Sequence, residues 1–507
     1  MPVLRDIVLR IHREHPELTA KHRYAIRTYL PDLADSVPET LTDVASWEER
    51  TRFQDGVIRR AAHGIAELLN SYVDLTGPLT LTVDNQELQA VLTRRSPLVT
   101  VLSGVSALPQ PTEEAVRSYI SFGDFEIAAA LAKHVVTQDP VEDRRIRLLH
   151  AFSVRSTDPE LSEQILLEVQ EKYADPATLM ATNYSLAMLH TTFHARPDLS
   201  RAHSLARKAV ELADELSDPF ARSFQRNGLA LVELRFGRPE AALDLTTEAL
   251  GILGTELPDS ALEHHAIVHL NRARILQALG RLDEALQDFD AAVARDPYFP
   301  EYHYYRAGCV QLLGDAEGAI AGYERAMALS APWPEPYYSR GDLRAARGDI
   351  QGALEDFGYV LELDPDHLDA RVNRAALLAE LDDYDAAMAD VEHGLKLAPD
   401  NAHLLCTKGL LMMDDMEAAR ELFTRALRGD PNLTPALVNS AILDYDGGNF
   451  PAAIEKLTRA LEITPQDADI WLNRSVALQA AGRLDEAASD YRNAIELAAT
   501  SAQTAEQ

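Results

Sequence analysis

Two pairs of histidines have the spacing with which a helix presents two metal ligands on one face. His190 and His194 form one pair, and His265 and His269 form the other, each pair four residues apart. Neither pair lies in the HExxH sequence of a metalloprotease, and no third ligand follows at a recognisable offset. The sequence therefore predicts no metal site.

Motifs for catalysis are missing from the sequence. It has no GxxxxGK(S/T) loop to hold phosphates and no GxSxG nucleophile turn. The two cysteines, Cys309 and Cys406, are 97 residues apart and have no second cysteine or histidine at ligand spacing. We therefore expect no enzyme activity, no catalytic residue and no cofactor, and the isolated cysteines indicate a reducing compartment.

A basic and an acidic residue recur sixteen residues apart. Four such pairs occur: Arg272 and Asp288, Arg340 and Asp356, Arg374 and Asp390, and Arg474 and Asp490. Three units depart from the pattern, and their two positions hold Arg306 and Gly322, Lys408 and Leu422, and Ser440 and Lys456. Because guanidinium and carboxylate fit together as a fork, we predict an ion pair between the two helices of each regular unit, rather than a basic stripe for carboxylate ligands.

The segments that carry these residues repeat with a period of about 34. One small residue marks the period at spacings of 34, 34, 34, 32, 34 and 34: Ala285, Ala319, Ala353, Ala387, Ala419, Ala453 and Ala487. An earlier unit has Ala242 in the same role, 43 residues before Ala285. A second small residue precedes each alanine, a large apolar residue follows it, and proline closes most units. This pattern predicts two amphipathic helices per unit, which cross closely where the small residues lie and end at the proline.

The repeat resembles the tetratricopeptide repeat family in its length, its crossing of small residues and its terminal proline. The resemblance covers an array of eight units over 216–499, and it implies an all-α, right-handed superhelical solenoid. Upstream it fades, so we expect degenerate helical pairs over 109–215. There, 122–136 and 198–213 have the pattern of second helices, and 177–190 has that of a first helix. Residues 500–507 are expected to be a flexible tail.

Asparagine precedes the arginine position in several units: Asn271, Asn373, Asn439 and, in the last unit, Asn473. This row is similar to the asparagine ladder on the concave face of the O-GlcNAc transferase repeat domain. The resemblance implies that the amides hydrogen-bond the backbone of an extended peptide, which suits a group that both donates and accepts. The alternative is that asparagine merely tolerates a solvated helix face.

Tyrosines gather where the asparagine row is interrupted, in the segments 298–306 and 332–340. Tyr304 and Tyr338 are 34 residues apart, so we expect both on the same face of successive first helices, with Tyr305 beside them. An apolar ring with a polar tip is a good anchor for a partner. The flanking acids favour a ligand of apolar and basic character: Glu301, Glu335 and Asp342.

Residues 1–108 do not repeat. Helical patterns lead into the strand LTLTVDN, a helix ELQAVLTRR and a second strand PLVTVL, which predicts a small parallel sheet fragment. The order resembles the Walker B region of the STAND-type regulatory ATPases of actinobacterial transcription factors, with Asp84 at the strand end. Asn85 stands where that family has a second acid, and the phosphate loop is missing. We interpret the region as a decayed remnant; an unrelated α/β cap and a working nucleotide site are the alternatives.

Charge and apolar patterning limit the partners. The 507 residues carry 80 acidic and 48 basic side chains, a formal net charge of −32, which disfavours nucleic acid. No apolar run approaches the roughly 18 residues that span a bilayer, and no signal peptide is evident, so we expect a cytoplasmic protein without a membrane partner. The function expected is a non-enzymatic scaffold for a protein or peptide. The alternatives are a regulatory module related to actinobacterial transcriptional regulators and an accessory component of a peptide-modifying biosynthetic pathway.

The last repeat has no visible cap helix, since only AATSAQTAEQ follows Leu497. A solenoid generally needs a solvating cap, because its final apolar face is otherwise exposed. We expect this face to lie around Trp471, Val476 and Leu478. A homodimer through the C-terminal ends would cover the same patch twice.

Overall fold

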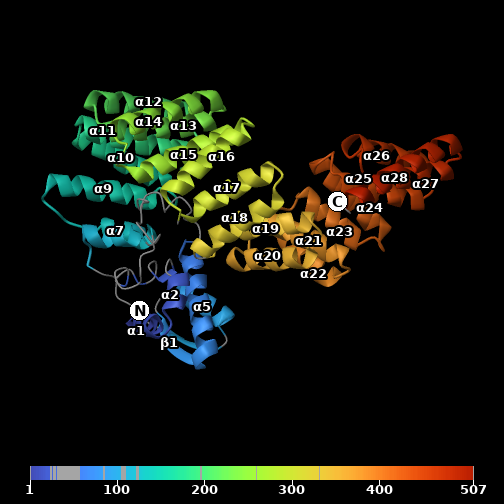
Figure 1. Ribbon diagram of the computed structural model, residues 1–507, viewed down its shortest axis with the longest axis horizontal. Coiled ribbons are helices and arrows are strands. Elements are labelled where there is room, and N and C mark those ends of the chain that lie inside the picture. The colour runs from blue at the N-terminus through green and yellow to red at the C-terminus, as the bar shows by residue number, and fades with distance from the viewer. Residues whose placement is uncertain are drawn as a thin grey trace. The chain divides into compact units, whose positions relative to one another are not determined.

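The computed structural model describes residues 2–22, 25–26, 30, 33, 57–83, 86–96, 98–103, 110–121, 125–194, 197–258, 260–297, 299–330 and 332–505. The chain divides into two compact units, Met1–Pro336 and Tyr337–Gln507 (Figure 1). Helices dominate both units, and the fold is a solenoid of helical pairs with a small strand-containing region at its N-terminal end, as the sequence predicts.

The first unit begins with that small region. Its helices α1 (Pro2–Glu14), α2 (Pro16–Lys21) and α5 (Val57–Thr76) precede strand β1 (Leu79–Val83), and α6 (Gln86–Arg95) connects β1 to strand β2 (Val99–Ser103). The two strands pair in parallel, with Leu79 opposite Val99, which confirms the predicted parallel fragment. Buried aliphatic side chains from these helices and strands form one core. Asp84 and Asn85, the residues that carried the ATPase interpretation, lie outside the described residues.

Helical pairs make up the rest of the first unit. They are α7 (Glu113–Ser121) with α8 (Phe125–Ala132), α9 (Pro140–Val154) with α10 (Pro159–Lys172), α11 (Pro176–Met188) with α12 (Leu199–Leu216), α13 (Pro219–Arg235) with α14 (Pro239–Glu256), α15 (Leu262–Ala278) with α16 (Leu282–Arg295), and α17 (Pro300–Leu312) with α18 (Ala316–Leu329). A π-helical turn, η3 (Leu189–Phe193), extends α11. The pairs thus continue upstream of residue 216 through the segment where the repeat pattern fades.

The second unit continues with the same element order. Its pairs are α19 (Pro334–Ala346) with α20 (Ile350–Leu363), α21 (Leu368–Glu380) with α22 (Tyr384–Leu397), α23 (Ala402–Leu411) with α24 (Met416–Gly429), α25 (Thr434–Asp446) with α26 (Phe450–Ile463), and α27 (Ala468–Ala480) with α28 (Leu484–Ala505). Helix α28 runs through most of the segment 500–507 that was expected to be a flexible tail.

Short turns join the two helices of a pair, and their sequence explains why the first helix ends there. Gly314 and Gly348 adopt φ of +90° and +78°, the left-handed region that favours glycine after a helix. The second helix begins two residues after each glycine, at Ala316 and at Ile350. Its cap is Asp315 or Asp349, whose carboxylate accepts a hydrogen bond from the backbone N–H three residues later.

Small residues lie where the two helices of a pair cross, as predicted from the spacing. Ala353 and Ala387 are completely buried. At Gly409, a Cβ atom would lie 2.6 Å from the ring of Phe423 on the second helix, closer than side chains pack. The large apolar residue therefore fills the space that the small residue leaves free.

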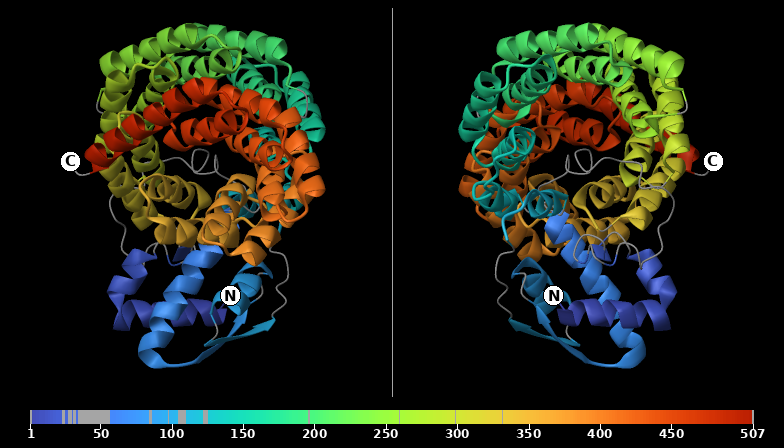
Figure 2. Two further views of the ribbon diagram at one scale, coloured as in Figure 1. Left: turned by 90° about the vertical axis from the view of Figure 1, so that its right-hand side faces the viewer. Right: turned by 90° about the vertical axis from the view of Figure 1, so that its left-hand side faces the viewer.

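First helices of successive pairs also contact one another within each unit. Helix α11 contacts α13 and α13 contacts α15, and in the second unit α21 contacts α23 and α23 contacts α25. Figure 2 shows successive helical pairs lying side by side along the chain within each unit. Of the helices that the structure describes, none is both long enough and apolar enough for a membrane span.

Candidate binding surface on the first helices

The four predicted ion pairs within units are present, and each is a two-point fork. Arg374 on α21 donates from Nε and Nη2 to the two carboxylate oxygens of Asp390 on α22, at 2.7 and 2.8 Å. The same fork joins Arg272 to Asp288, Arg340 to Asp356 and Arg474 to Asp490. All four aspartates are at most 5% exposed. These arginines therefore fix one helix of a pair to the other.

Burial and hydrogen bonding act in opposite directions on such an aspartate. Burial raises the pKa of Asp288, but hydrogen bonds from His269 and Arg272 outweigh it and keep the pKa below its ordinary value. His269 is thus committed to Asp288 at 2.8 Å, and its helical neighbour His265 lies 3.1 Å from the carbonyl oxygen of Leu257. Both histidines of this pair are therefore engaged in contacts within the fold.

Two of the three units that depart from the sixteen-residue pattern have substitute ion pairs. Arg306, which faces Gly322, binds Asp290 at 2.6 Å instead. In the pair α25–α26 the signs are exchanged, because Lys456 on the second helix donates to Ser440 and binds Asp444 on the first helix. Arg420 from the preceding pair contacts the same carboxylate. Burial raises the pKa of Asp444, but the two cations lower it by more, so that the pKa lies below its usual range.

Family models for the tetratricopeptide repeat match three stretches of the sequence, residues 270–334, 344–408 and 438–502. Each stretch coincides with helical pairs that have the crossing and the ion pairs described above. The chain contains tetratricopeptide repeats. The helical pairs from α7 to α14 lie outside the matched stretches.

Solved structures with similar folds cover only parts of the chain. A tetratricopeptide repeat protein from Parabacteroides merdae is 20% identical and has a TM-score of 0.38, over 52% of this chain and 98% of its own. MamA from Desulfovibrio magneticus RS-1 is 24% identical with a TM-score of 0.29, over 33% and 96%. A further crystal structure of MamA is 21% identical with a TM-score of 0.26, over 32% and 96%. No curated protein matches the sequence.

The asparagines of the first repeat helices reach toward the preceding first helix. Asn373 on α21 donates from Nδ2 to the hydroxyl oxygen of Tyr338 on α19, at 3.3 Å. Asn439 on α25 is hydrogen-bonded to the thiol of Cys406 on α23; burial raises the pKa of that thiol to about 12, and the hydrogen bond opposes the rise. These two asparagines therefore connect neighbouring first helices, a role that their spacing did not predict.

Asn271 differs from the other predicted asparagines in its burial. It donates to the side-chain oxygen of Asn227 on α13 at 2.9 Å and is only 1% exposed. Its own amide oxygen is buried without a hydrogen-bond partner among the described residues. A ligand on the surface of the repeat cannot reach this amide, so Asn271 is removed from the candidate binding residues. Asn373, Asn439 and Asn473 are half-buried.

The tyrosines of the first unit belong to an aromatic cluster. The ring of Tyr304 lies 5.3 Å from that of Trp333, which is 1% exposed, and 5.2 Å from that of Tyr305. The guanidinium of Arg274 lies 4.9 Å from the ring of Tyr305. Both tyrosines are half-buried, so their rings pack against the repeat while part of each remains accessible. Glu301, expected to flank them, is only 8% exposed and cannot contribute an exposed charge.

Tyr338 in the second unit has a more acidic and more open setting. Its ring stacks on the imidazole of His367 at 5.2 Å and contacts that of Phe357 at 5.8 Å. Burial raises the pKa of Tyr338, and the nearby carboxylates of Asp342 and Asp369 raise it further. Both carboxylates are exposed, so this half-buried ring lies beside negative charge that solvent or a ligand can reach.

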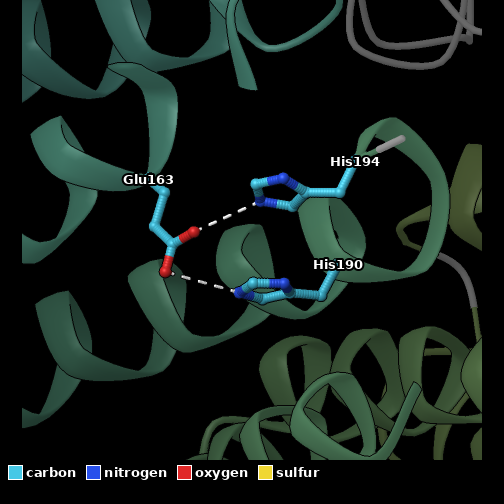
Figure 3. A group of neighbouring side chains, drawn as sticks. All are labelled: Glu163, His190 and His194. Atoms are coloured by element: carbon cyan, nitrogen blue, oxygen red, sulfur yellow. Dashed lines mark ion pairs between the residues drawn. The ribbon is translucent and has the colours of Figure 1, made fainter. Parts of the chain in front are cut away.

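The structure adds one cluster that the sequence did not predict. His190 and His194 meet Glu163, which comes from the preceding helical pair (Figure 3). The 26 residues between Glu163 and His190 have no metal-site signature, so only the packing of α10 against the end of α11 brings them together.

The C-terminal face differs in part from its prediction. Leu478 is 3% exposed and belongs to the core, while Trp471 is half-buried and donates from its indole nitrogen to the carbonyl oxygen of Pro465. Val476, Tyr491 and Ile495 are 41%, 51% and 52% exposed. Leu472 on α27 and Leu484 on α28 are also exposed, at 40% and 63%, so the large exposed apolar side chains among the described residues of these two helices number five.

Proposed function

We propose that this protein is a non-enzymatic scaffold whose first repeat helices bind an extended segment of a partner protein or peptide. The observation that carries the proposal is the contact between Asn373 and Tyr338, which places a half-buried amide and a half-buried ring together on neighbouring first helices. An asparagine has two donors and an accepting oxygen, and this contact uses one donor. Asn373 therefore keeps hydrogen-bonding capacity for a peptide backbone.

The chemistry around Tyr338 indicates which segment would bind. The ring offers an apolar surface, and Asp342 and Asp369 offer negative charge at its edge. Lysine or arginine beside an apolar side chain would satisfy both, and the net charge of −32 would favour the approach of a basic partner. Asn439 and Asn473 extend the same layer of first helices toward the C-terminal end.

The same proposal includes a cytoplasmic location, no nucleic-acid or membrane partner, and a homodimer through the C-terminal face. The acidic composition supports the exclusion of nucleic acid, and the exposed apolar side chains of α27 and α28 support the dimer. An actinobacterial origin and a STAND-type ancestry of the N-terminal region belong to the proposal on the sequence resemblance alone.

An array of immobilised extended peptides tests the proposal. The array combines apolar residues with lysine or arginine at varied spacing, and a matched set carries glutamate in place of the basic residues. The full chain should bind members of the basic set and none of the acidic set. Affinities of the positive peptides are then measured by fluorescence anisotropy.

Variants on the two helix layers locate the binding surface. Asn373→Ala combined with Asn473→Ala should weaken peptide affinity about 30-fold, because each of the two amide hydrogen bonds contributes about 1 kcal/mol. Tyr384→Ala is the matched control, because this tyrosine is 53% exposed on the second helix α22. Equal affinity of the asparagine variant and the parent chain, or an equal loss in the control, would contradict the proposal.

A further inference from the structure

The cluster of Glu163, His190 and His194 lies in the first unit and includes none of the tyrosines and asparagines of the candidate binding surface (Figure 3). Glu163 is on α10, His190 lies in the π-helical turn η3, and His194 is the residue at which that turn ends. One carboxylate oxygen of Glu163 lies 3.6 Å from Nε2 of His190, and the other lies 3.2 Å from Nε2 of His194. Three potential ligand atoms thus face one another from two helices.

The packing around the two imidazoles leaves the hydrogen-bonding capacity of these two nitrogens unused. Nε2 of His190 and Nε2 of His194 are both buried and have no hydrogen-bond partner among the described residues. His190 is only 5% exposed, so water cannot readily supply the missing partner. Burying a polar atom without a partner costs free energy, and such an atom in a folded protein calls for an explanation. The two rings stack at 4.7 Å, and both Nε2 atoms point toward Glu163 (Figure 3).

The separations suit a small metal ion. Zinc binds histidine nitrogen and carboxylate oxygen at about 2.0–2.2 Å, so the ligand atoms of a tetrahedral site are roughly 3.3 Å apart. The ligand atoms here lie within 4.8 Å of one another, and the two nitrogen-to-oxygen separations bracket the required value. Small side-chain rotations, without a change in the helices, would close the longest separation.

The surroundings supply further groups that such a site uses. The carboxylate of Glu160, one helical turn before Glu163, lies 3.8 Å from Nδ1 of His194. A carboxylate that accepts a hydrogen bond from the second ring nitrogen orients a metal-binding histidine and makes it a better ligand. Glu160 lies just beyond hydrogen-bonding distance. A π-helical turn within a helix is also rare and occurs often at functional sites.

Arg201 on α12 is the competing cation. Its Nη2 atom lies 2.6 Å from a carboxylate oxygen of Glu163, which neutralises the acid without a metal. The side chain of Arg201 is 44% exposed and can turn into solvent when a metal takes its place. The guanidinium and the metal would therefore bind in exchange.

We infer that Glu163, His190 and His194 form a binding site for a divalent transition metal, with zinc the best match, and that water completes its coordination. Two imidazoles and a carboxylate are ligand types that zinc prefers. Ions that bind through oxygen atoms, such as magnesium, would find too few oxygen ligands here. The metal would join α10 to η3, in helical pairs that the repeat-family models do not match. This inference is independent of the proposed peptide-binding function.

Metal titration of the chelator-treated full chain tests the site. We expect one equivalent of Zn²⁺ to bind by isothermal titration calorimetry, and Co²⁺ in its place to give the strong visible absorption of a tetrahedral complex. Glu163→Gln keeps the shape of the side chain but loses a charged ligand, and His194→Ala loses a nitrogen ligand. Each should weaken zinc binding at least about 100-fold.

Two further variants separate a metal site from a general effect on folding. Arg201→Ala should bind zinc more tightly than the parent chain, because it removes the competing cation, and simple unfolding would not produce this result. His269→Ala is the matched control from the other pair of histidines at this spacing, and it should bind zinc as the parent does. Thermal unfolding should show a zinc-dependent rise in Tm for the parent chain, for His269→Ala and for Arg201→Ala, but not for Glu163→Gln or His194→Ala.

The inference is wrong if the parent chain binds zinc no more tightly than Glu163→Gln and His194→Ala. It is also wrong if the bound equivalent is lost when Cys309 and Cys406 are replaced by serine, which would assign the metal to the thiols. Unchanged or weaker binding by Arg201→Ala would show that the guanidinium and the metal do not compete for Glu163.

Discussion

Removal of the Asp390 carboxylate should destabilise its repeat more than any single removal of an arginine that binds it. Asp390 is 3% exposed and accepts two hydrogen bonds from Arg374 and one from Arg371 at 2.9 Å. Arg371 is itself buried, whereas the side chain of Arg374 is 28% exposed. Asp390→Ala therefore leaves one buried guanidinium without its carboxylate, whereas Arg374→Ala leaves Asp390 paired with Arg371.

The expected magnitudes follow from this difference in burial. Breaking a buried ion pair by removing one partner costs about 3–5 kcal/mol, which is the range expected for Asp390→Ala. Loss of hydrogen bonds to a charged group that keeps another partner costs about 1.5–3 kcal/mol, the range expected for Arg374→Ala. Asp390→Asn keeps the volume and one accepting oxygen, so it should lie between the parent chain and Asp390→Ala.

Urea unfolding followed by circular dichroism measures these changes, and hydrogen exchange shows where they act. Each repeat contacts mainly its neighbours, so protection should fall first in α21 and α22 and only later in distant pairs. The matched control is Glu486→Ala. The carboxylate of Glu486 accepts a similar fork from Arg483, at 2.7 and 2.6 Å, but both side chains are about half-exposed.

The control should leave stability almost unchanged, because exposed ion pairs contribute little. The reasoning would be refuted if Glu486→Ala and Asp390→Ala lowered the unfolding midpoint equally. A uniform loss of protection along the whole chain would refute the local part of the argument.

Three further predictions test other parts of the structure. Gly409→Ala should destabilise by about 1–3 kcal/mol through overpacking, whereas Gly358→Ala, whose Cβ would meet no atom closer than 3.6 Å, should stabilise by about 0.5–1 kcal/mol in urea unfolding. Hydrogen bonds from Tyr173 and two cations outweigh burial and lower the pKa of Asp143 to about 2, so its stabilisation is complete above pH about 4 and lost as pH falls through about 2; Asp143→Asn should flatten this part of an acid titration. Light scattering at micromolar concentration should give a dimer for the parent chain and a monomer for Ile495→Glu, and a parent monomer with well-protected α27 and α28 would contradict the C-terminal interface.

The sequence predicted the repeat architecture and the ion pairs for one physical reason. A period of 34 fixes the rotation of each helix, so residues sixteen apart face each other in every regular unit. The same argument fails where the period is absent. Glu163 and His190 belong to pairs without the repeat signature, and a π-helical turn changes the helical phase before His194. No spacing rule could have joined these residues.

Burial was the other quantity that the sequence did not determine. Asn271 and Asn373 have the same place in the repeat pattern, yet one is buried against Asn227 and the other is half-buried beside Tyr338. Asn271 meets a second asparagine, Asn227 on α13, and one donor of its amide is used in that buried contact. Leu478 likewise has the sequence position of an exposed end residue. It is buried because α28 packs against α27, the helix that carries it.

The forks between arginine and aspartate close within one helical pair, whereas the asparagine contacts run from one pair to the next. A duplicated repeat therefore carries both partners of its own ion pair, and it needs nothing from its new neighbours to neutralise them. The exchanged signs of Lys456 and Asp444 are tolerated for the same reason, since both charges lie in the same pair. An engineered array could thus gain or lose whole units, such as 368–401, without stranding a buried charge, and only the weaker amide contacts at the new junction would have to be rebuilt.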